Sequence, residues 1–169
     1  HPVNLDVQGK DSYKNLGETV TAAKVYDAMS VYKISGRTLA RLESIIDPVH
    51  GLDQLTMPKL VLLCGQDDFF APDSTRSWWP QLPEPKAFYM YANSGHAGFI
   101  PAFRDAATSF IIAVTRGQEL PAISWSIDNR TGDIAVRQLG KQKPLSVRVW
   151  QATTSQSRAR DFRGAPYTD

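Results

Sequence analysis

Two short segments of the sequence carry residue types that acid–base catalysis uses. Asp68 lies three residues after Gly65, which closes a continuous apolar run, and His96 ends the sequence Asn93-Ser94-Gly95-His96 after a second run. A serine nucleophile needs an imidazole to take its proton, and the imidazole needs a carboxylate to fix its tautomer. The pattern therefore predicts that His96 is a general base and that Asp68 orients it.

Each of these residues also has a purely structural interpretation. His96 could be an ordinary loop histidine, and Asp67 and Asp68 could form a solvated turn. Asp67 could also be the acid in place of Asp68, although the spacing from Gly65 favours Asp68. The pairing of an acid with a histidine on neighbouring loops strengthens the catalytic interpretation, because a triad requires both.

The nucleophile is not found in the sequence. No Gly-x-Ser-x-Gly motif occurs, and Ser94 has no strand-to-helix elbow of its own. In α/β-hydrolases the acid and then the histidine follow the nucleophile along the chain. We therefore expect the serine upstream of His1, on another segment or chain of the same protein. The sequence has no cysteine pair, His-x-x-x-His motif or glycine-rich phosphate loop, so we expect no metal and no cofactor.

The elements that must position these residues alternate between strands and helices. Hydrophobic periodicity predicts strands over 59–65 and 86–91, helices over 17–31, 38–46 and 72–79, a helix from Pro101 to Gly117, and a loop over 51–58. Such alternation predicts a parallel sheet, with catalytic groups at the carboxyl ends of its strands. Trp78 and Trp79 could line a substrate pocket, but packing beneath a lid is the more common use of adjacent tryptophans.

The pattern changes to an alternation of period two near residue 118. Strands are predicted over 123–127, 134–136 and 145–149, with turns at 128–133 and 140–144. This favours a small antiparallel, β-sandwich-like module over 119–169 behind an α/β portion over 1–118. The predicted class is α/β, with a parallel sheet and flanking helices followed by the β module.

Composition and charge exclude several classes of protein. The 169 residues include 42% hydrophobic residues, 19 basic and 17 acidic residues, and a net charge of +2, which gives no field for nucleic acid. No apolar run approaches the roughly 20 residues of a membrane helix. Cys64, the single cysteine, lies in an apolar run that predicts a buried thiol and leaves the redox compartment open.

The sequence leaves the compartment of the protein undecided. His1-Pro2-Val3-Asn4 has no signal-peptide pattern, so we expect any targeting segment upstream. Asn129-Arg130-Thr131 fits an N-glycosylation motif, which would matter in a secreted protein, but such short matches are common by chance.

Several separated motifs give the chain a family resemblance. They are Ile46-Asp47-Pro48, Leu55-Thr56-Met57-Pro58-Lys59-Leu60, Asp68-Phe69-Phe70-Ala71-Pro72-Asp73-Ser74, Tyr91-Ala92-Asn93-Ser94-Gly95-His96, Val149-Trp150-Gln151-Ala152-Thr153 and Arg160-Asp161-Phe162-Arg163. In this order they resemble the PhoPQ-activated pathogenicity-related family, which includes the autocrine proliferation repressor proteins. The resemblance implies an α/β-hydrolase domain with a β module behind it, Asp68 and His96 at the acid and histidine positions, and a serine that precedes His1. Val49-His50 departs from an expected aromatic-rich stretch.

Three functional hypotheses follow. The first is hydrolysis of an ester or amide, in a small-molecule or peptide substrate, by an upstream serine together with His96 and Asp68. The second is a non-catalytic secreted signalling or binding protein on the same scaffold, because some members of the family are described as secreted or virulence-associated. The third is a subunit of a larger assembly. Fold alone cannot choose among them.

Overall fold

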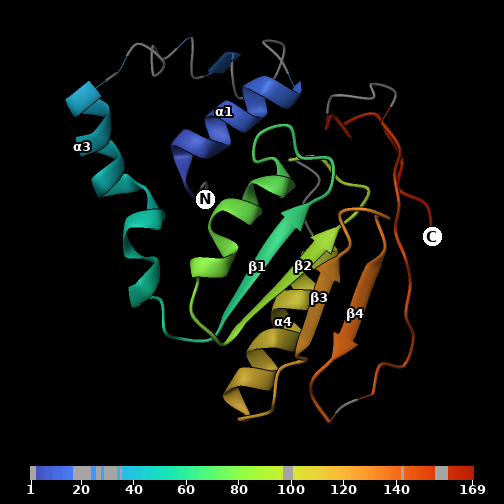
Figure 1. Ribbon diagram of the computed structural model, residues 1–169. Coiled ribbons are helices and arrows are strands. Elements are labelled where there is room, and N and C mark those ends of the chain that lie inside the picture. The colour runs from blue at the N-terminus through green and yellow to red at the C-terminus, as the bar shows by residue number, and fades with distance from the viewer. Residues whose placement is uncertain are drawn as a thin grey trace.

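The computed structural model describes residues 3–16, 24–25, 28, 34, 36–96, 101–141, 143–154 and 160–169 (Figure 1). Along the chain lie α1 (Leu5–Leu16), α3 (Gly36–Ile46), the 3-10 helix η2 (Pro48–Gln54), β1 (Lys59–Cys64), the 3-10 helices η3 (Pro72–Ser77) and η4 (Trp79–Gln81), β2 (Lys86–Tyr91), α4 (Pro101–Thr115), β3 (Ile123–Ile127) and β4 (Ile134–Gln138).

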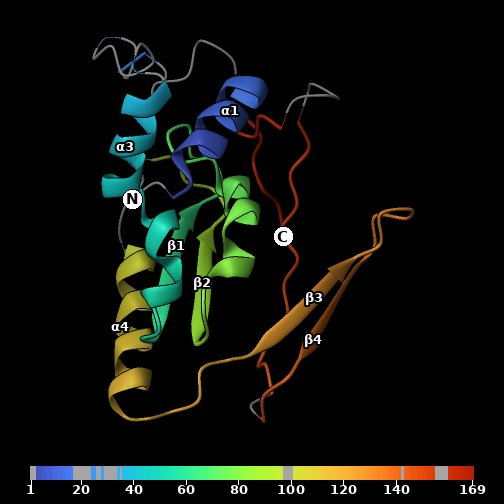
Figure 2. The same ribbon diagram turned by 60° about the vertical axis from the view of Figure 1, so that its left-hand side comes forward.

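A parallel strand pair forms the centre of the molecule. β1 and β2 pair in register from Lys59 opposite Lys86 to Cys64 opposite Tyr91. Helix α4 lies on one face of the pair, and η3 and η4 lie on the other (Figure 2). Tyr89 of β2 packs edge-on against Phe103 of α4, with 6.2 Å between the ring centroids. Both strands were predicted from the sequence, and their carboxyl ends lie at the same edge of the sheet.

The buried core lies beneath η2, η3 and η4. Its most buried members are Leu52, Trp78 and Leu82, and Val61 of β1 and Trp79 pack against them. Leu52 lies in η2, and Trp78 and Leu82 flank η4 at its two ends. This cluster therefore joins η2 to η4 beside β1.

A buried carboxylate joins the start of α1 to the start of η2. Asp47 is 6% exposed. Its Oδ1 accepts hydrogen bonds from the backbone N–H groups of Val49 (3.0 Å) and Asn4 (2.9 Å), and its Oδ2 accepts one from Leu5 (2.6 Å). One side chain therefore satisfies free N–H groups at the beginnings of two helices.

Several predicted elements differ from the structure. The segment 72–79 is not one α-helix but two 3-10 helices, because Pro72 and Pro80 each begin a short turn and Trp78 leaves helical geometry at φ −132°. The predicted loop over 51–58 is helical as far as Gln54. Helix α1 was not predicted, while α3 and α4 were. Of the predicted helix over 17–31, all but three residues lie outside the described part of the chain.

The predicted β module is a two-stranded hairpin in the described residues. β3 and β4 pair antiparallel, with Trp125 opposite Val136, and the hairpin projects from the rest of the molecule (Figure 2). Trp125 of the hairpin packs against Phe88 of β2, with 5.8 Å between the ring centroids. The predicted strand over 145–149 was wrong, because residues 143–150 form no strand. Alternating side chains give only a propensity, and a strand also needs a neighbour for its backbone.

Candidate functional site

The loops that follow β1 and β2 are joined by backbone hydrogen bonds. The N–H of Gly65 donates to Tyr91 O (2.9 Å), and the N–H of Gln66 donates to Ser94 O (3.0 Å). A Cβ atom on Gly65 would lie 2.4 Å from the carbonyl oxygen of Ala92. Glycine is therefore required at this position for the two loops to approach so closely.

This close approach brings Asp67 and His96 together. His96 Nδ1 lies 3.1 Å from Asp67 Oδ2 and 3.2 Å from Asp67 Oδ1. The Asp67 side chain is 9% exposed, and its Oδ1 also accepts hydrogen bonds from the backbone N–H groups of Phe69 (2.7 Å) and Phe70 (2.8 Å). These donors fix the carboxylate in position while it holds the imidazole.

Two aromatic rings set the plane of the imidazole. Phe69 stacks on His96 at 4.8 Å between centroids with a 23° interplanar angle, and Phe70 packs edge-on at 5.0 Å and 87°. The His96 side chain is 41% exposed. With Nδ1 on a carboxylate, Nε2 is the nitrogen left to exchange a proton with a second group. An imidazole held in this way has the geometry that general-base catalysis requires.

The carboxylate that contacts His96 belongs to Asp67, whereas the sequence favoured Asp68. Both aspartates lie in the loop that follows β1, outside the strand. The two carboxylates have different neighbours. The pKa of Arg163 is raised chiefly by its hydrogen bond to Asp161, and the negative charge of Asp68 adds to this effect. The glycine spacing located the loop, but it could not choose between adjacent aspartates.

Two other groups near the site are buried. Ser94 is 5% exposed, and its hydroxyl donates to Gly95 O at 3.2 Å. Cys64 is buried as predicted, and this burial raises the pKa of its thiol, with an opposing effect from a hydrogen bond to Ser94. Neither position suits a nucleophile that must reach a substrate.

The C-terminal residues 160–169, here called the C-terminal strap, return to both site loops. Asn93 Nδ2 donates to Tyr167 O (2.9 Å), and the N–H of Tyr167 donates to Asn93 Oδ1 (2.7 Å). Gln66 Nε2 donates to Ala165 O (3.0 Å). The N-terminal end of the strap is held by an ion pair of 2.8 Å between Arg160 and Asp73. No sequence pattern predicted these contacts, although their residues adjoin the Arg160-Asp161-Phe162-Arg163 motif.

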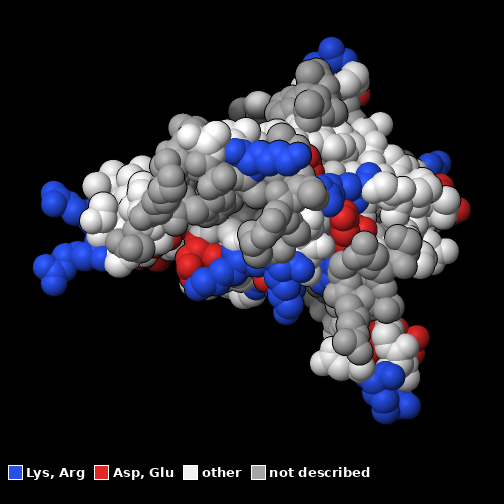
Figure 3. Space-filling view, turned by 90° about the horizontal axis from the view of Figure 1, so that it is seen from above, with Lys and Arg blue, Asp and Glu red and all other residues white. Residues whose placement is uncertain are grey.

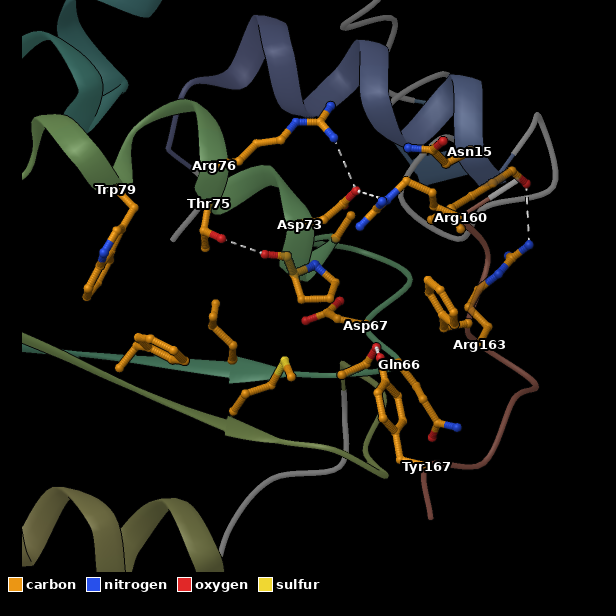
Figure 4. A pocket seen from close by; sticks show the side chains of 18 of the residues that line it. Asn15, Gln66, Asp67, Asp73, Thr75, Arg76, Trp79, Arg160, Arg163 and Tyr167 are labelled. Carbon is orange, nitrogen blue, oxygen red and sulfur yellow. Dashed lines mark hydrogen bonds and ion pairs between the residues drawn. The ribbon is translucent and has the colours of Figure 1, made fainter. Parts of the chain in front are cut away.

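A cavity of about 620 Å³ adjoins Asp67 (Figure 4). Its lining comes from α1, the β1 loop, η3, η4, β2, β3 and the C-terminal strap. Trp79 lines it, whereas Trp78 is buried in the core. Trp79 also packs against this core, so both tryptophans contribute to packing.

The surface charge is mixed. On the face viewed from above, basic and acidic side chains lie next to one another (Figure 3). Among the described residues, no group of three or more His, Cys, Asp and Glu side chains is placed to hold a metal ion. In the same part of the chain, every helix is too short or too polar to span a membrane.

Comparison with known proteins identifies relatives over most of the chain. The profile of the PhoPQ-activated pathogenicity-related protein family matches residues 2–163. Autocrine proliferation repressor protein A of Dictyostelium discoideum is 30% identical over 158 residues, which are 87% of this chain and 32% of the relative. The chain thus spans about a third of that relative's length. No solved structure matches. The chain belongs to the PhoPQ-activated pathogenicity-related protein family.

Proposed function

We propose that this chain is the C-terminal part of a serine hydrolase with an α/β-hydrolase fold, and that it supplies the histidine and the acid of a Ser-His-Asp triad. The observation that carries the proposal is the contact between Asp67 and His96 Nδ1 at the carboxyl ends of two parallel strands. Catalytic groups gather at this edge of open parallel sheets. The geometry favours Asp67 over Asp68 as the acid.

The proposed chemistry is acyl transfer to serine and then to water. The serine Oγ attacks the carbonyl carbon of an ester or amide while His96 Nε2 takes its proton. The imidazolium, stabilised by Asp67, gives that proton to the departing alcohol or amine. Water then attacks the acyl-serine in the same way and releases the acid. Asp67 accepts the hydrogen bond from Nδ1 throughout and keeps the imidazole ring oriented.

The serine is proposed to lie on an upstream segment of the same protein. Within the described residues β1 pairs only with β2, so one edge of each strand has free backbone groups. A parallel sheet of two strands leaves its faces and edges open, as β2 shows with Phe88, Tyr89, Met90 and Tyr91 all at least 36% exposed. Further strands from the upstream segment would pair along these edges.

Covalent labelling tests the proposal. The full-length protein, treated with a fluorophosphonate probe, should become labelled on one serine upstream of His1. His96→Ala should abolish labelling, whereas His50→Ala, which changes an exposed histidine, should leave it unchanged. Labelling that survives His96→Ala would remove His96 from the mechanism.

A second candidate is a secreted signalling or binding protein without catalysis. It is favoured by the name of the Dictyostelium relative, which describes a repressor of proliferation rather than an enzyme. A folded full-length protein that no fluorophosphonate labels would support this candidate and refute the hydrolase. Recovery of the protein from culture medium would test the secreted location directly.

A further inference from the structure

We infer that the cavity beside Asp67 binds the apolar acyl part of an uncharged ester. The inference rests on the proposed function, since it assigns a substrate class to that same site. Three features of the cavity carry it: an aromatic and aliphatic wall, a polar end at Asp67, and arginines that are already paired with carboxylates.

The wall of the cavity is formed by a chain of aromatic contacts. Trp79 and Phe88 pack edge to face with 5.4 Å between centroids, and Phe88 and Trp125 do so with 5.8 Å. These rings come from η4, β2 and β3. Aliphatic and thioether side chains complete the wall, namely Leu63, Met90 and Ile127. Such a surface gains free energy by covering an alkyl or aryl group.

The polar end of the cavity lies at Asp67. Figure 4 places Trp79 at one end of the cavity and Gln66, Asp67 and Tyr167 toward the other. Asp67 lines this end of the cavity and contacts His96 Nδ1, whereas His96 does not line the cavity. A ligand with its apolar part near Trp79 would therefore place its polar group on the Asp67 side of the catalytic pair. An acyl ester has this arrangement of an apolar chain and one polar end.

The charges around the cavity favour an uncharged ligand. Each of its three arginines has a carboxylate partner, namely Arg76 with Asp11 (2.7 Å), Arg160 with Asp73 (2.8 Å) and Arg163 with Asp161 (2.7 Å). An anionic ligand would have to compete with these partners and would meet the negative charge of Asp67. The volume of about 620 Å³ lies within the range of roughly 300 to 1,000 Å³ for small-molecule pockets. A medium-length acyl chain or an aryl group suits this space better than an acetyl group.

A pair of variants on the hairpin tests the inference. In the full-length protein, the kcat/KM for p-nitrophenyl octanoate should exceed that for the acetate by about tenfold or more. Ile127 lines the cavity and is 57% exposed, so Ile127→Trp should reduce the space without disturbing the core. We expect it to lower the octanoate-to-acetate ratio by about tenfold. The matched control is Ile134→Trp at the cross-strand partner, outside the cavity lining, which should leave the ratio unchanged.

A binding measurement separates failure of the cavity from failure of the hydrolase. Calorimetric titration with p-nitrophenyl octyl ether, which has no ester bond, should show binding that Ile127→Trp weakens and Ile134→Trp does not. Such binding in a protein that fluorophosphonate does not label would refute the hydrolase proposal and support apolar ligand binding in the cavity. Two results would refute acyl binding in the cavity and still support the hydrolase. One is labelling and turnover with no chain-length preference. The other is a chain-length preference that Ile127→Trp leaves intact.

Discussion

At the scale of single residues, the site depends on how one carboxylate is held. Asp67 accepts two backbone N–H groups and holds His96 by Nδ1, so its position is fixed on both sides. Asp68 is next to it in sequence but acts on Arg163. The two aspartates have the same chemical type and differ in their neighbours.

Substituting each aspartate in turn tests this difference. In the full-length protein, Asp67→Asn should lower kcat for ester hydrolysis by roughly a thousandfold or more, because an amide cannot stabilise the imidazolium and can fix the wrong tautomer. Asp68→Asn, the matched control, should change kcat by less than about tenfold. Steady-state kinetics on p-nitrophenyl esters measures both. A large loss in Asp68→Asn with activity retained in Asp67→Asn would contradict the assignment.

At the scale of elements, two local devices bring the helices and loops into place. The Asp47 carboxylate joins the beginnings of α1 and η2, and Gly65 lets the loop after β1 approach the loop after β2. Both residues are far less conspicuous in the sequence than the catalytic candidates. Each can be removed by one substitution.

Asp47→Ala should destabilise the fold. The change leaves backbone N–H groups of Asn4, Leu5 and Val49 without their acceptor, and the expected loss is about 2 kcal/mol in the free energy of unfolding. Urea unfolding followed by circular dichroism measures it. The control, Asp53→Ala, changes an exposed aspartate of the same 3-10 helix and should cost less than about 0.5 kcal/mol. Equal stability of Asp47→Ala and the wild type would refute this role.

Gly65→Ala should separate the two site loops. A methyl group 2.4 Å from the Ala92 carbonyl oxygen forces the backbone apart, at a cost of about 2 kcal/mol in stability. We also expect weaker fluorophosphonate labelling, because the separation moves His96 relative to Asp67. Gly140→Ala is the control, since nothing lies within 4 Å of a Cβ there. Equal labelling and equal free energies of unfolding for the two variants would show that the site does not depend on the close approach of the two loops at Gly65.

At the scale of the whole molecule, the C-terminal strap contacts both loops of the candidate site. Its contacts with Gly65, Gln66 and Asn93 span sequence separations of up to 102 residues. Asp161 and Arg163 form a two-contact ion pair inside the strap (2.9 and 2.7 Å), and Arg163 also donates to Leu16 O at 3.3 Å. The strap thus links α1 to the loops that carry Asp67 and His96.

The Asp161–Arg163 pair predicts a pH dependence of stability. The hydrogen bond to Arg163 holds the pKa of Asp161 below its ordinary value, against a smaller opposing effect of burial. The pair therefore stabilises the fold fully above the unfolded-state pKa of about 3.9 and loses this effect as the pH falls through the lower folded-state pKa. Asp161→Asn should be less stable than the wild type near neutral pH.

Urea unfolding of both proteins between neutral and strongly acidic pH measures this difference. The stability gap between wild type and Asp161→Asn should shrink as the solution becomes more acidic. Glu119→Gln, at an exposed position, controls for the loss of one negative charge. A gap that stays constant from neutral to acidic pH would show that the ion pair contributes nothing through the ionisation of Asp161.

The isolated 169-residue chain should not hydrolyse p-nitrophenyl acetate above the background rate. It holds an acid and a histidine but no serine elbow, and its parallel sheet has only two strands in the described residues. Addition of the upstream segment should restore activity if the two parts associate. Turnover by the purified chain that His96→Ala abolishes would contradict this prediction.

The sequence by itself determined the strands β1 and β2, the helices α3 and α4, and the two loops that carry the candidate site. These features depend on local patterns of apolar side chains, prolines and glycines, which are read within a few residues. The tertiary structure alone decided that Asp67 faces His96, that residues 145–149 pair with no strand, and that the C-terminal strap reaches Asn93 and Gln66. Such features depend on side-chain direction and on contacts between distant parts of the chain, which no local pattern contains.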